Sequence, residues 1–337
     1  MTDLRDREMK PKYSYIIPFY NVRAYVRPCL DSVLAQTFPD WECICVDDGS
    51  PDGLGEILDE YAAKDSRFKV IHQPNAGVGA ARNVALSAMS GEWFFFVDGD
   101  DLTSPWTCEM CESALRVHPD ADMLMFGDTS FPQDGVCDWG AGPEGMKLEC
   151  RDVSHVVDLW MYRTGHCTRA YRRSVYGDLR NPNLIKSQDR YFLLDCLFRT
   201  NKVVKIDRPI SGVRRRIGST MRSPMTVKKL QAEIVLSEHF VGLVESSDRQ
   251  VDPVFVRSLV NRYVETFIEA LGQLQGKGEQ ASVFRSWIKM VGRLQKSRVI
   301  TGFQQLRVRI LLLLPFRLTA NLLCLLPHKI KCMGVHR

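Results

Sequence analysis

The amino-acid sequence predicts an α/β fold with a mostly parallel sheet and helices on both of its faces. Short apolar runs alternate with helical spacings through the first hundred residues, in the order strand, helix, strand, helix, strand, helix, strand. The clearest run is Trp93–Val97, whose five consecutive apolar residues are typical of a strand buried on both faces. Three carboxylates follow it within four residues, at the carboxyl end of the strand, where open α/β sheets bind ligands.

The first strand is expected in the apolar run Tyr15–Asn21, which ends in Pro and Asn and offers a place for a nucleotide. A helix should follow, because apolar residues recur at the spacing of one helical face until Pro39-Asp40 stops it. The residues of this face are Tyr25, Cys29, Leu30, Val33, Leu34 and Phe38.

The second strand is expected over Trp41–Val46, and it delivers Asp47-Asp48-Gly49-Ser50 at its carboxyl end. Beyond it we expect a helix, a strand and a glycine-rich turn that opens another helix, over Leu54–Ala63, Phe68–Ile71 and Asn75–Asn83. Strands that alternate with helices in this way pair in parallel through right-handed crossovers.

The cluster Asp98-Gly99-Asp100-Asp101 predicts a cation site. A hard divalent ion relieves the repulsion among such carboxylates, and Mg²⁺ or Mn²⁺ held by one or two of them completes its shell with substrate phosphates. An acidic turn without a ligand is the alternative, since so short a motif also occurs by accident.

Six ordered segments resemble glycosyltransferase family 2, whose members have the GT-A nucleotide-sugar fold. The segments are IIPFYN, CLDSVLAQTFPDWE, VDDGSPDG, NAGVGAARN, GEWFFFVDGDD and, more weakly, SQDRYF near residue 189. The resemblance covers roughly residues 12–220 and is strong up to Leu102. It implies a GT-A-like catalytic domain over residues 1–220, with a donor half over 12–102 and an acceptor half over 103–220.

The same resemblance implies a donor site for a nucleoside diphosphate sugar, with UDP as the expected nucleotide. Pro18 and Tyr20 would line the base pocket, where Tyr20 stacks on a uracil-type ring and Asn21 follows. Asp48 would accept a hydrogen bond from the base, with Asp47 beside it. Taken singly, Tyr20 also fits ordinary packing at a strand end and Asp48 an ordinary turn.

Three further residues receive donor roles from the resemblance. Arg82 would face the base and ribose or the diphosphate, and Asp98 would touch the ribose. Asp100 would hold Mn²⁺ or Mg²⁺ on the diphosphate, as the last carboxylate of the D-x-D motif does in similar enzymes. The alternative for Arg82 is a solvated helix residue.

A catalytic base is needed as well, because an acceptor hydroxyl loses its proton when it attacks the anomeric carbon opposite the departing diphosphate. Asp189 is the candidate, since it begins a predicted helix where similar enzymes carry a Glu-Asp pair followed by an aromatic residue. In this chain Gln188 replaces that Glu, which removes one charge beside the base. Asp189 also fits an acid that complements a helix dipole, and Asp195 is the second candidate for the base.

Basic residues follow this helix. Arg214, Arg215 and Arg216, with Ser219, lie where similar enzymes present an Arg-x-x-Gly-Ser element near the phosphates or the acceptor. A solvated basic turn explains the arginines equally well. The segment Phe131–Glu149 is rich in Gly, Pro and Asp and is interpreted as a loop on the acceptor side.

At 337 residues and 45% hydrophobic, the chain can bury one large domain and a smaller appendage. Its 11 cysteines are scattered, and no charged segment followed by an apolar one resembles a leader at the N-terminus, so we expect reduced thiols and a cytoplasmic protein. The single C-x-x-C, Cys108 to Cys111, lies on a predicted helix, and core packing explains it better than a metal or redox role.

The charge is unevenly distributed. Residues 280–337 hold 11 Lys or Arg and no acid, which leaves 34 bases against 40 acids, a net −6, in residues 1–279. Two Leu-rich runs in this tail, 310–316 and 318–327, are each shorter than the ~18–20 apolar residues that a spanning helix needs. We therefore expect a helical C-terminal segment over 221–337, whose basic amphipathic tail binds an anionic membrane surface. A hairpin packed on the protein is the alternative, and nucleic acid is not an expected partner.

These observations predict a metal-dependent, inverting glycosyltransferase of the hexosyltransferase type, peripheral on the cytoplasmic face of the membrane. Its donor would be a UDP-sugar and its acceptor a lipid-linked glycan or a cell-surface polysaccharide. Two other functions use the same features: a sugar nucleotidyltransferase, which releases pyrophosphate, and a catalytically silent protein that binds nucleotide sugars.

Overall fold

The computed structural model describes residues 10–162, 165–216, 226–256 and 258–259. These residues form two compact units. The first unit takes in residues 10–153, 165–183 and 199–216, and the second takes in 154–162, 184–198 and the described residues from 226 onward. Ser219 and the basic tail over 280–337 lie outside the described residues, so their roles and the boundary near residue 220 stay predictions.

The first unit is built on parallel strands whose residues are almost all apolar. They are β1 (Tyr13–Phe19), β2 (Trp41–Asp47), β3 (Phe68–His72) and β4 (Trp93–Phe96), hydrogen-bonded in the order β3-β2-β1-β4. Every residue of β1, β2 and β4 is buried, as expected for strands covered on both faces. The expected α/β fold with a mostly parallel nucleus is confirmed.

Beyond β4 the sheet becomes mixed. Antiparallel β9 (Arg169–Arg172) lies next to β4 and is followed by β6 (Met123–Pro132) and β10 (Lys202–Arg215). The short strands β5 (Leu102–Thr103) and β7 (Leu148–Asp152) both pair antiparallel with β10. Because β9 is antiparallel to both β4 and β6, and β10 is parallel to β6, the carboxyl ends of β4 and β10 lie at the same edge of the sheet.

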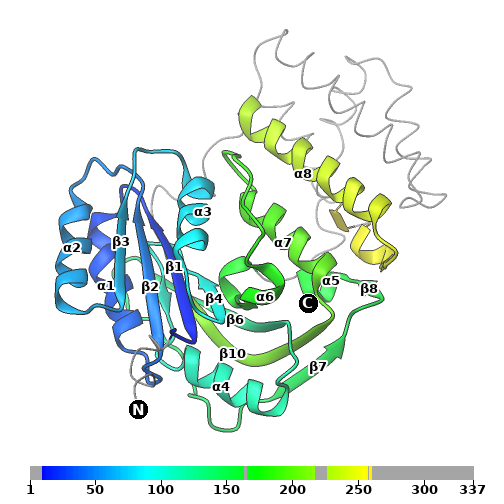
Figure 1. The fold of residues 1–337 in the computed structure, drawn as a ribbon, viewed down its shortest axis with the longest axis horizontal. Coiled ribbons are helices and arrows are strands. Elements are labelled where there is room, and N and C mark those ends of the chain that lie inside the picture. The colour runs from blue at the N-terminus through cyan, green and yellow to red at the C-terminus, as the bar shows by residue number, and fades with distance from the viewer. Residues whose placement is uncertain (1–9, 163–164, 217–225, 257, 260–337) are drawn as a thin grey trace, which may run out of the picture. The chain divides into compact units, whose positions relative to one another are not determined.

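Helices cover both faces of the parallel strands (Figure 1). α1 (Arg23–Leu34) and α2 (Leu54–Lys64) lie on one face, and α3 (Val78–Ala88) lies on the other. Alternate residues of β1, from Tyr13 to Phe19, share one hydrophobic core with the buried sides of α1, α2 and α4 (Thr107–Val117). The remaining short elements of this unit are η1 (His166–Thr168) and α6 (Arg173–Tyr176).

Cys108 and Cys111 are fully buried on α4 within this core, which confirms that the C-x-x-C is a packing element. Burial raises the pKa of both thiols. All nine cysteines of the described part are free thiols, and seven of them are buried.

The second unit contains α5 (Leu159–Tyr162), α7 (Gln188–Arg199) and α8 (Val227–Ser246), although Arg199 itself belongs to the first unit. Two short strands, β8 (Val156–Val157) and β11 (Gln250–Val251), pair in parallel. Among the described residues, no helix combines the length and apolarity needed to cross a membrane.

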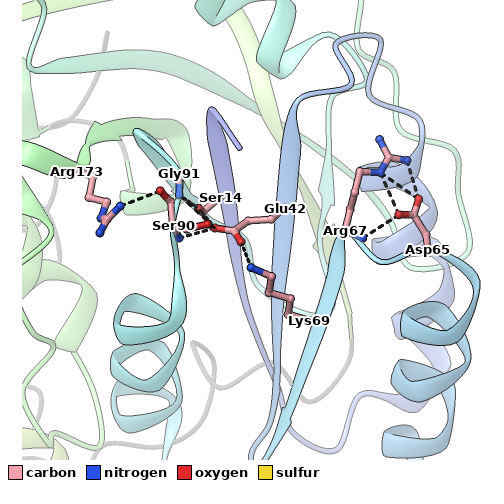
Figure 2. A network of polar contacts seen from close by, with 8 residues as sticks. All are labelled: Ser14, Glu42, Asp65, Arg67, Lys69, Ser90, Gly91 and Arg173. Carbon is pink, nitrogen blue, oxygen red and sulfur yellow. Dashed lines mark hydrogen bonds and ion pairs between the residues drawn. The ribbon is translucent and has the colours of Figure 1, made fainter. Parts of the chain in front are cut away.

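A buried carboxylate ties the amino ends of the parallel strands together (Figure 2). Glu42 on β2 is 3% exposed, and it accepts hydrogen bonds from Ser14 Oγ at 2.7 Å, Ser90 N at 2.5 Å and Lys69 Nζ at 2.6 Å. Burial alone would raise the pKa of Glu42, but the hydrogen bonds from Lys69, Ser14 and Ser90 outweigh it and lower the pKa. This end of the sheet is opposite the carboxyl ends, so the network stabilises the fold at a distance from the acid cluster.

Replacing Glu42 by alanine should lower the free energy of unfolding by about 3 kcal/mol, because several buried donors lose their acceptor. Urea unfolding at pH 7 measures this change. The matched control is Asp65→Asn, which removes a more exposed ion pair with Arg67, 2.7 Å long, and should cost less than about 1 kcal/mol (Figure 2).

The same network should make stability depend on pH. Because the folded state lowers the pKa of Glu42, its contribution is present above the unfolded value of roughly 4.3 and is lost as the pH falls through the folded value. The stability difference between the native chain and Glu42→Gln should therefore shrink below about pH 4. A difference that stays constant from pH 7 to pH 3 would contradict this account.

Candidate functional site

The acid cluster Asp98-Gly99-Asp100-Asp101 follows β4 after one residue, Val97, and contacts the end of β1. A Cβ at Gly99 would meet Phe19 Cδ1 at 2.5 Å and the carbonyl oxygen of Pro18 at 2.9 Å. Only glycine fits at this close approach. The contact places the three carboxylates at the carboxyl edge of the parallel strands, as the sequence predicts.

Asp98 is held by a buried arginine on α3. Arg82 NH2 donates to Asp98 Oδ1 at 2.7 Å, and its guanidinium lies 5.8 Å from the centre of the Phe96 ring. The Arg82 side chain is 4% exposed, whereas that of Asp98 is 40% exposed. The solvated alternative for Arg82 is therefore wrong, and Asp98 keeps an accessible oxygen beside a fixed positive charge.

The end of β10 holds the other two acids. Arg214 donates from its backbone N to Asp101 Oδ1 at 2.8 Å and from Nε to the carbonyl oxygen of Asp100 at 2.9 Å. Arg216 Nε donates to Asp100 Oδ2, whereas Arg215 turns to Ser130 Oγ. Among the three predicted arginines, Arg216 is the one whose side chain is hydrogen-bonded to a carboxylate of the cluster.

Asp101 shows that the cluster concentrates negative charge. Burial, followed by the charge of Asp98, raises the pKa of Asp101 to about 8, although the hydrogen bond from the Arg214 backbone opposes the shift. Three carboxylates held this close together fit a hard divalent cation such as Mn²⁺ or Mg²⁺. Asp100 and Asp98 are the partly exposed acids that can hold such an ion.

Asp98 also lies close to a histidine and a cysteine, which are softer metal ligands than carboxylates. Ligand atoms of Asp98, His166 and Cys167 lie within 4.8 Å of one another, and Cys167 Sγ is 3.6 Å from His166 Nε2. Burial, followed by the charge of Arg82, lowers the pKa of His166 to about 3, so the ring is neutral. No local pattern in the sequence points to His166, because the pairing of β9 with β4 brings η1 to this strand from about seventy residues away.

Asp48 ties the end of β2 to the glycine-rich turn. The residue is 2% exposed, and its two oxygens accept from Ala76 N at 2.8 Å and Gly77 N at 2.9 Å, with Gln73 Nε2 adding a bond at 2.7 Å. Gly77 has a φ of 91°, which favours glycine at this position. Asp48 thus fixes the turn that opens α3, and with it the helix that carries Arg82.

Asp47 braces the neighbouring strand end. It accepts from Ser50 N at 2.9 Å, and its Oδ2 lies 3.0 Å from His72 Nδ1 at the end of β3. Hydrogen bonds to Asp47 and then to Asp59 raise the pKa of His72. Asp47 is therefore a support of this edge and is largely covered from solvent.

The end of β1 presents an exposed aromatic ring beside a strained backbone. Pro18 lies within the buried strand, whereas Tyr20 is 50% exposed. Asn21 has a φ of 54°, and its N donates to Ser50 Oγ at 2.8 Å. Non-glycine residues in this conformation cluster at ligand sites. Tyr20 has the accessible face that stacking on a base requires.

A pocket of about 510 Å³ lies beside the acid cluster in the same unit. It is bordered by the start of α1, Leu102, Arg214 and residues 133–137 and 139 of the expected acceptor-side loop. The loop is shorter than the expected Phe131–Glu149, because β6 runs to Pro132 and β7 begins at Leu148. The pocket shares Arg214 with the cluster, so a group bound there lies close to Asp100.

Asp189 lies in the first turn of α7, in the second unit. The residue before this helix, Ser187, has a φ of 65°, and its carbonyl oxygen accepts from Tyr191 N at 3.0 Å. The second candidate base, Asp195, is only 16% exposed and lies 2.7 Å from His239 Nε2 on α8. Asp195 is therefore largely covered and held in the contact between α7 and α8.

Comparisons with known proteins identify relatives of this chain. A model of the family described as glycosyl transferase family 2 matches residues 14–180. The putative teichuronic acid biosynthesis glycosyltransferase TuaG of Bacillus subtilis is 44% identical over 53% of this chain and 69% of its own length. Glycosyltransferase GlyA of Streptococcus pneumoniae is 49% identical over 63% of this chain and 32% of its own length.

The chain covers only part of the length of several relatives. It matches 28% and 33% of the length of two further Bacillus subtilis glycosyltransferases. Among solved structures, S. aureus TarS 1-349 in complex with UDP-GlcNAc aligns with a TM-score of 0.69 over 92% of this chain and 88% of that chain. The identity is 20%, so this likeness shows the fold alone.

Proposed function

Since the chain belongs to glycosyl transferase family 2, we propose that it transfers a sugar from a nucleoside diphosphate sugar to a glycan acceptor. The observation that carries this proposal is the acid cluster after β4, held between Arg82 on α3 and two arginines at the end of β10, Arg214 within the strand and Arg216 just after it. It combines accessible carboxylates with fixed guanidinium groups at the ligand-binding edge of an α/β sheet. Such an edge suits a diphosphate together with a divalent cation.

A UDP-sugar is the proposed donor. The exposed ring of Tyr20 would stack on the base beside Pro18 and Asn21, and Asp48 with Asp47 would hold this edge in shape. The oxygen of Asp98 that Arg82 leaves accessible would bind the ribose. The UDP-GlcNAc in the TarS complex supports the choice of nucleotide.

Asp100, with Asp98, would hold Mn²⁺ or Mg²⁺ in this proposal. When bound, the cation supplies Lewis-acid stabilisation of the departing diphosphate. Arg216 Nε donates to Asp100 Oδ2, so the guanidinium compensates the charge of this carboxylate. In this proposal Arg216 would also pair with a phosphate oxygen of the donor.

Asp189 would act as the general base. The acceptor oxygen forms its bond to the anomeric carbon while the bond from that carbon to the diphosphate oxygen breaks, and Asp189 accepts the acceptor proton. A single displacement of this kind inverts the configuration at the anomeric carbon. The name of TuaG supports a cell-surface polysaccharide, or its lipid-linked precursor, as the acceptor class.

A donor screen tests the proposal. The purified chain is incubated with Mn²⁺, an extract of lipid-linked glycans and a panel of nucleotide sugars, and the released nucleotide is identified by chromatography. We expect UDP from one UDP-sugar. Release of pyrophosphate from a nucleoside triphosphate with a sugar phosphate would identify a nucleotidyltransferase instead, and saturable donor binding without turnover would identify a silent binding protein.

The basic tail over residues 280–337 is proposed to bind an anionic membrane surface. The full chain should bind vesicles that contain anionic lipid, because each surface-proximal base adds roughly 1 kcal/mol to the burial of the Leu-rich runs. Binding measured by flotation should weaken as salt rises and fall sharply for neutral vesicles. Truncation near Gly302 should abolish binding while the donor is still bound. Equal binding to neutral and anionic vesicles would contradict the electrostatic account.

A further inference from the structure

Glu233 on α8 is a buried carboxylate that the proposed chemistry leaves unused. It belongs to the second unit, and its side chain is 4% exposed. Its position lies beyond residues 14–180, which the family model covers, and beyond the predicted limit of the catalytic domain at residue 220. A charge taken out of water at this site needs partners that compensate it.

The partners of Glu233 come from the segment that carries Asp189. Ser187 Oγ donates to Glu233 Oε1 at 2.5 Å, and Arg190 NH1 donates to Oε2 at 2.9 Å and to Oε1 at 3.1 Å. Lys186 Nζ lies 3.9 Å away. One carboxylate on α8 therefore contacts residues on both sides of the Gln188-Asp189 pair.

The backbone at Ser187 explains why such a contact is needed. A residue that precedes a helix usually has an extended backbone and caps the helix with its own side chain. Ser187 instead has a φ of 65°, and its hydroxyl is bonded to Glu233. A non-glycine residue persists in this conformation only when its surroundings hold it there.

Arg190 is fixed from two sides. Its NH1 group bonds to Glu233, and its Nε donates to the hydroxyl of Tyr162 on α5 at 3.0 Å. The first turn of α7 is thus anchored at Ser187 and at Arg190. Because helical residues share one rigid backbone, anchors at 187 and 190 set the direction in which Asp189 projects.

We propose that Glu233 on α8 is a positioning residue for Asp189. The proposal rests on the proposed function, in which Asp189 is the general base. Glu233 itself is buried and bonded to Arg190, so it acts through Ser187 and Arg190 and does not touch the substrate. A base held in one direction reacts faster than the same base on a loosely held turn.

The test measures kcat and donor affinity of the full chain carrying Glu233→Gln. Glutamine keeps the size of the side chain and an acceptor for Ser187, but it removes the charge that holds Arg190. We expect kcat to fall about 10- to 100-fold, while the Kd for UDP in the presence of Mn²⁺ changes less than about twofold. Ser187→Ala, which removes one hydrogen bond, should lower kcat about three- to tenfold.

The decisive readout is coupling to Asp189. In a chain that already carries Asp189→Asn, adding Glu233→Gln should lower kcat by less than about twofold, because there is no base left to position. If Glu233 only stabilised the fold, the second substitution would lower kcat by the same factor in both backgrounds. Glu233→Asp, which restores the charge, should recover part of kcat.

His239→Gln is the matched control, since it removes another polar contact between α8 and α7, the 2.7 Å pair with Asp195. It should lower the melting temperature without lowering kcat at 25 °C. An equal loss of kcat in Glu233→Gln and His239→Gln would overturn the proposal. The failures are distinguishable: an Asp189→Asn chain with normal kcat refutes the base assignment itself, whereas multiplicative effects refute only the role of Glu233.

Discussion

Replacing Asp100 by alanine should remove most of the sugar transfer that depends on Mn²⁺ or Mg²⁺ while the fold persists. The substitution deletes the carboxylate that would hold the cation on the diphosphate. Lewis-acid stabilisation of a leaving group lowers the reaction barrier by several kcal/mol. With about 1.4 kcal/mol for each tenfold change in rate, we expect kcat to fall by roughly 10²–10³. Nucleotide release at saturating donor, with and without Mn²⁺, measures this loss.

The fold should survive, because the Asp100 side chain is partly exposed and Arg216 can turn to water once its partner is gone. The matched control is Asp120→Asn, which also removes an ion pair with a basic residue, the 2.7 Å contact with Lys202 in the same unit. This variant should keep both the rate and the dependence on Mn²⁺. Full activity of the native chain in excess EDTA would contradict the cation site.

Replacing Asp189 by asparagine should leave the Kd for the donor within a few-fold of the native value and lower kcat by roughly 10²–10⁴, the range for a lost general base. The side chain keeps its size, so the first turn of α7 should still form. Binding is measured by titration calorimetry with UDP and Mn²⁺, and turnover by nucleotide release.

Asp195→Asn provides the comparison, since Asp195 is the other acid of α7 considered for this role. Its carboxylate is bonded to His239, so the substitution should weaken the contact between α7 and α8. If Asp195→Asn lost turnover while Asp189→Asn kept it, the base would be Asp195. If Asp189→Asn failed to bind UDP but catalysed normally at saturation, Asp189 would be a donor-binding residue.

The parallel half of the fold is predictable because its signals are local. The apolar run Trp93–Val97 marks β4, although Val97 itself lies just beyond the strand, and the helical spacing from Tyr25 marks α1. That helix ends at Leu34, four residues before Phe38, which is the last predicted apolar position. Residues 35–40, which lead to the next strand, are not helical. Acids placed after apolar strands were enough to locate the candidate site.

The second half of the sheet depends on contacts that the sequence does not display. β9 contains Arg169 and Arg172, so it has no apolar run, and it becomes a strand because β4 and β6 flank it. The bond from Arg216 to Asp100 joins residues 116 positions apart. Ser187 and Glu233, 46 positions apart, likewise meet only in the folded chain. Pairings of this kind are set by the topology of the fold, and no local sequence pattern predicts them.

The stereochemical course of the reaction tests the central claim most directly. Proton NMR identifies the anomer that is formed when the donor found in the screen is hydrolysed or transferred to its acceptor. A single displacement with Asp189 as the base predicts the configuration opposite to that of the donor, so an α-linked UDP-sugar gives a β product. A product with the donor's own configuration would require a double displacement or a front-face mechanism, and would contradict the role assigned to Asp189.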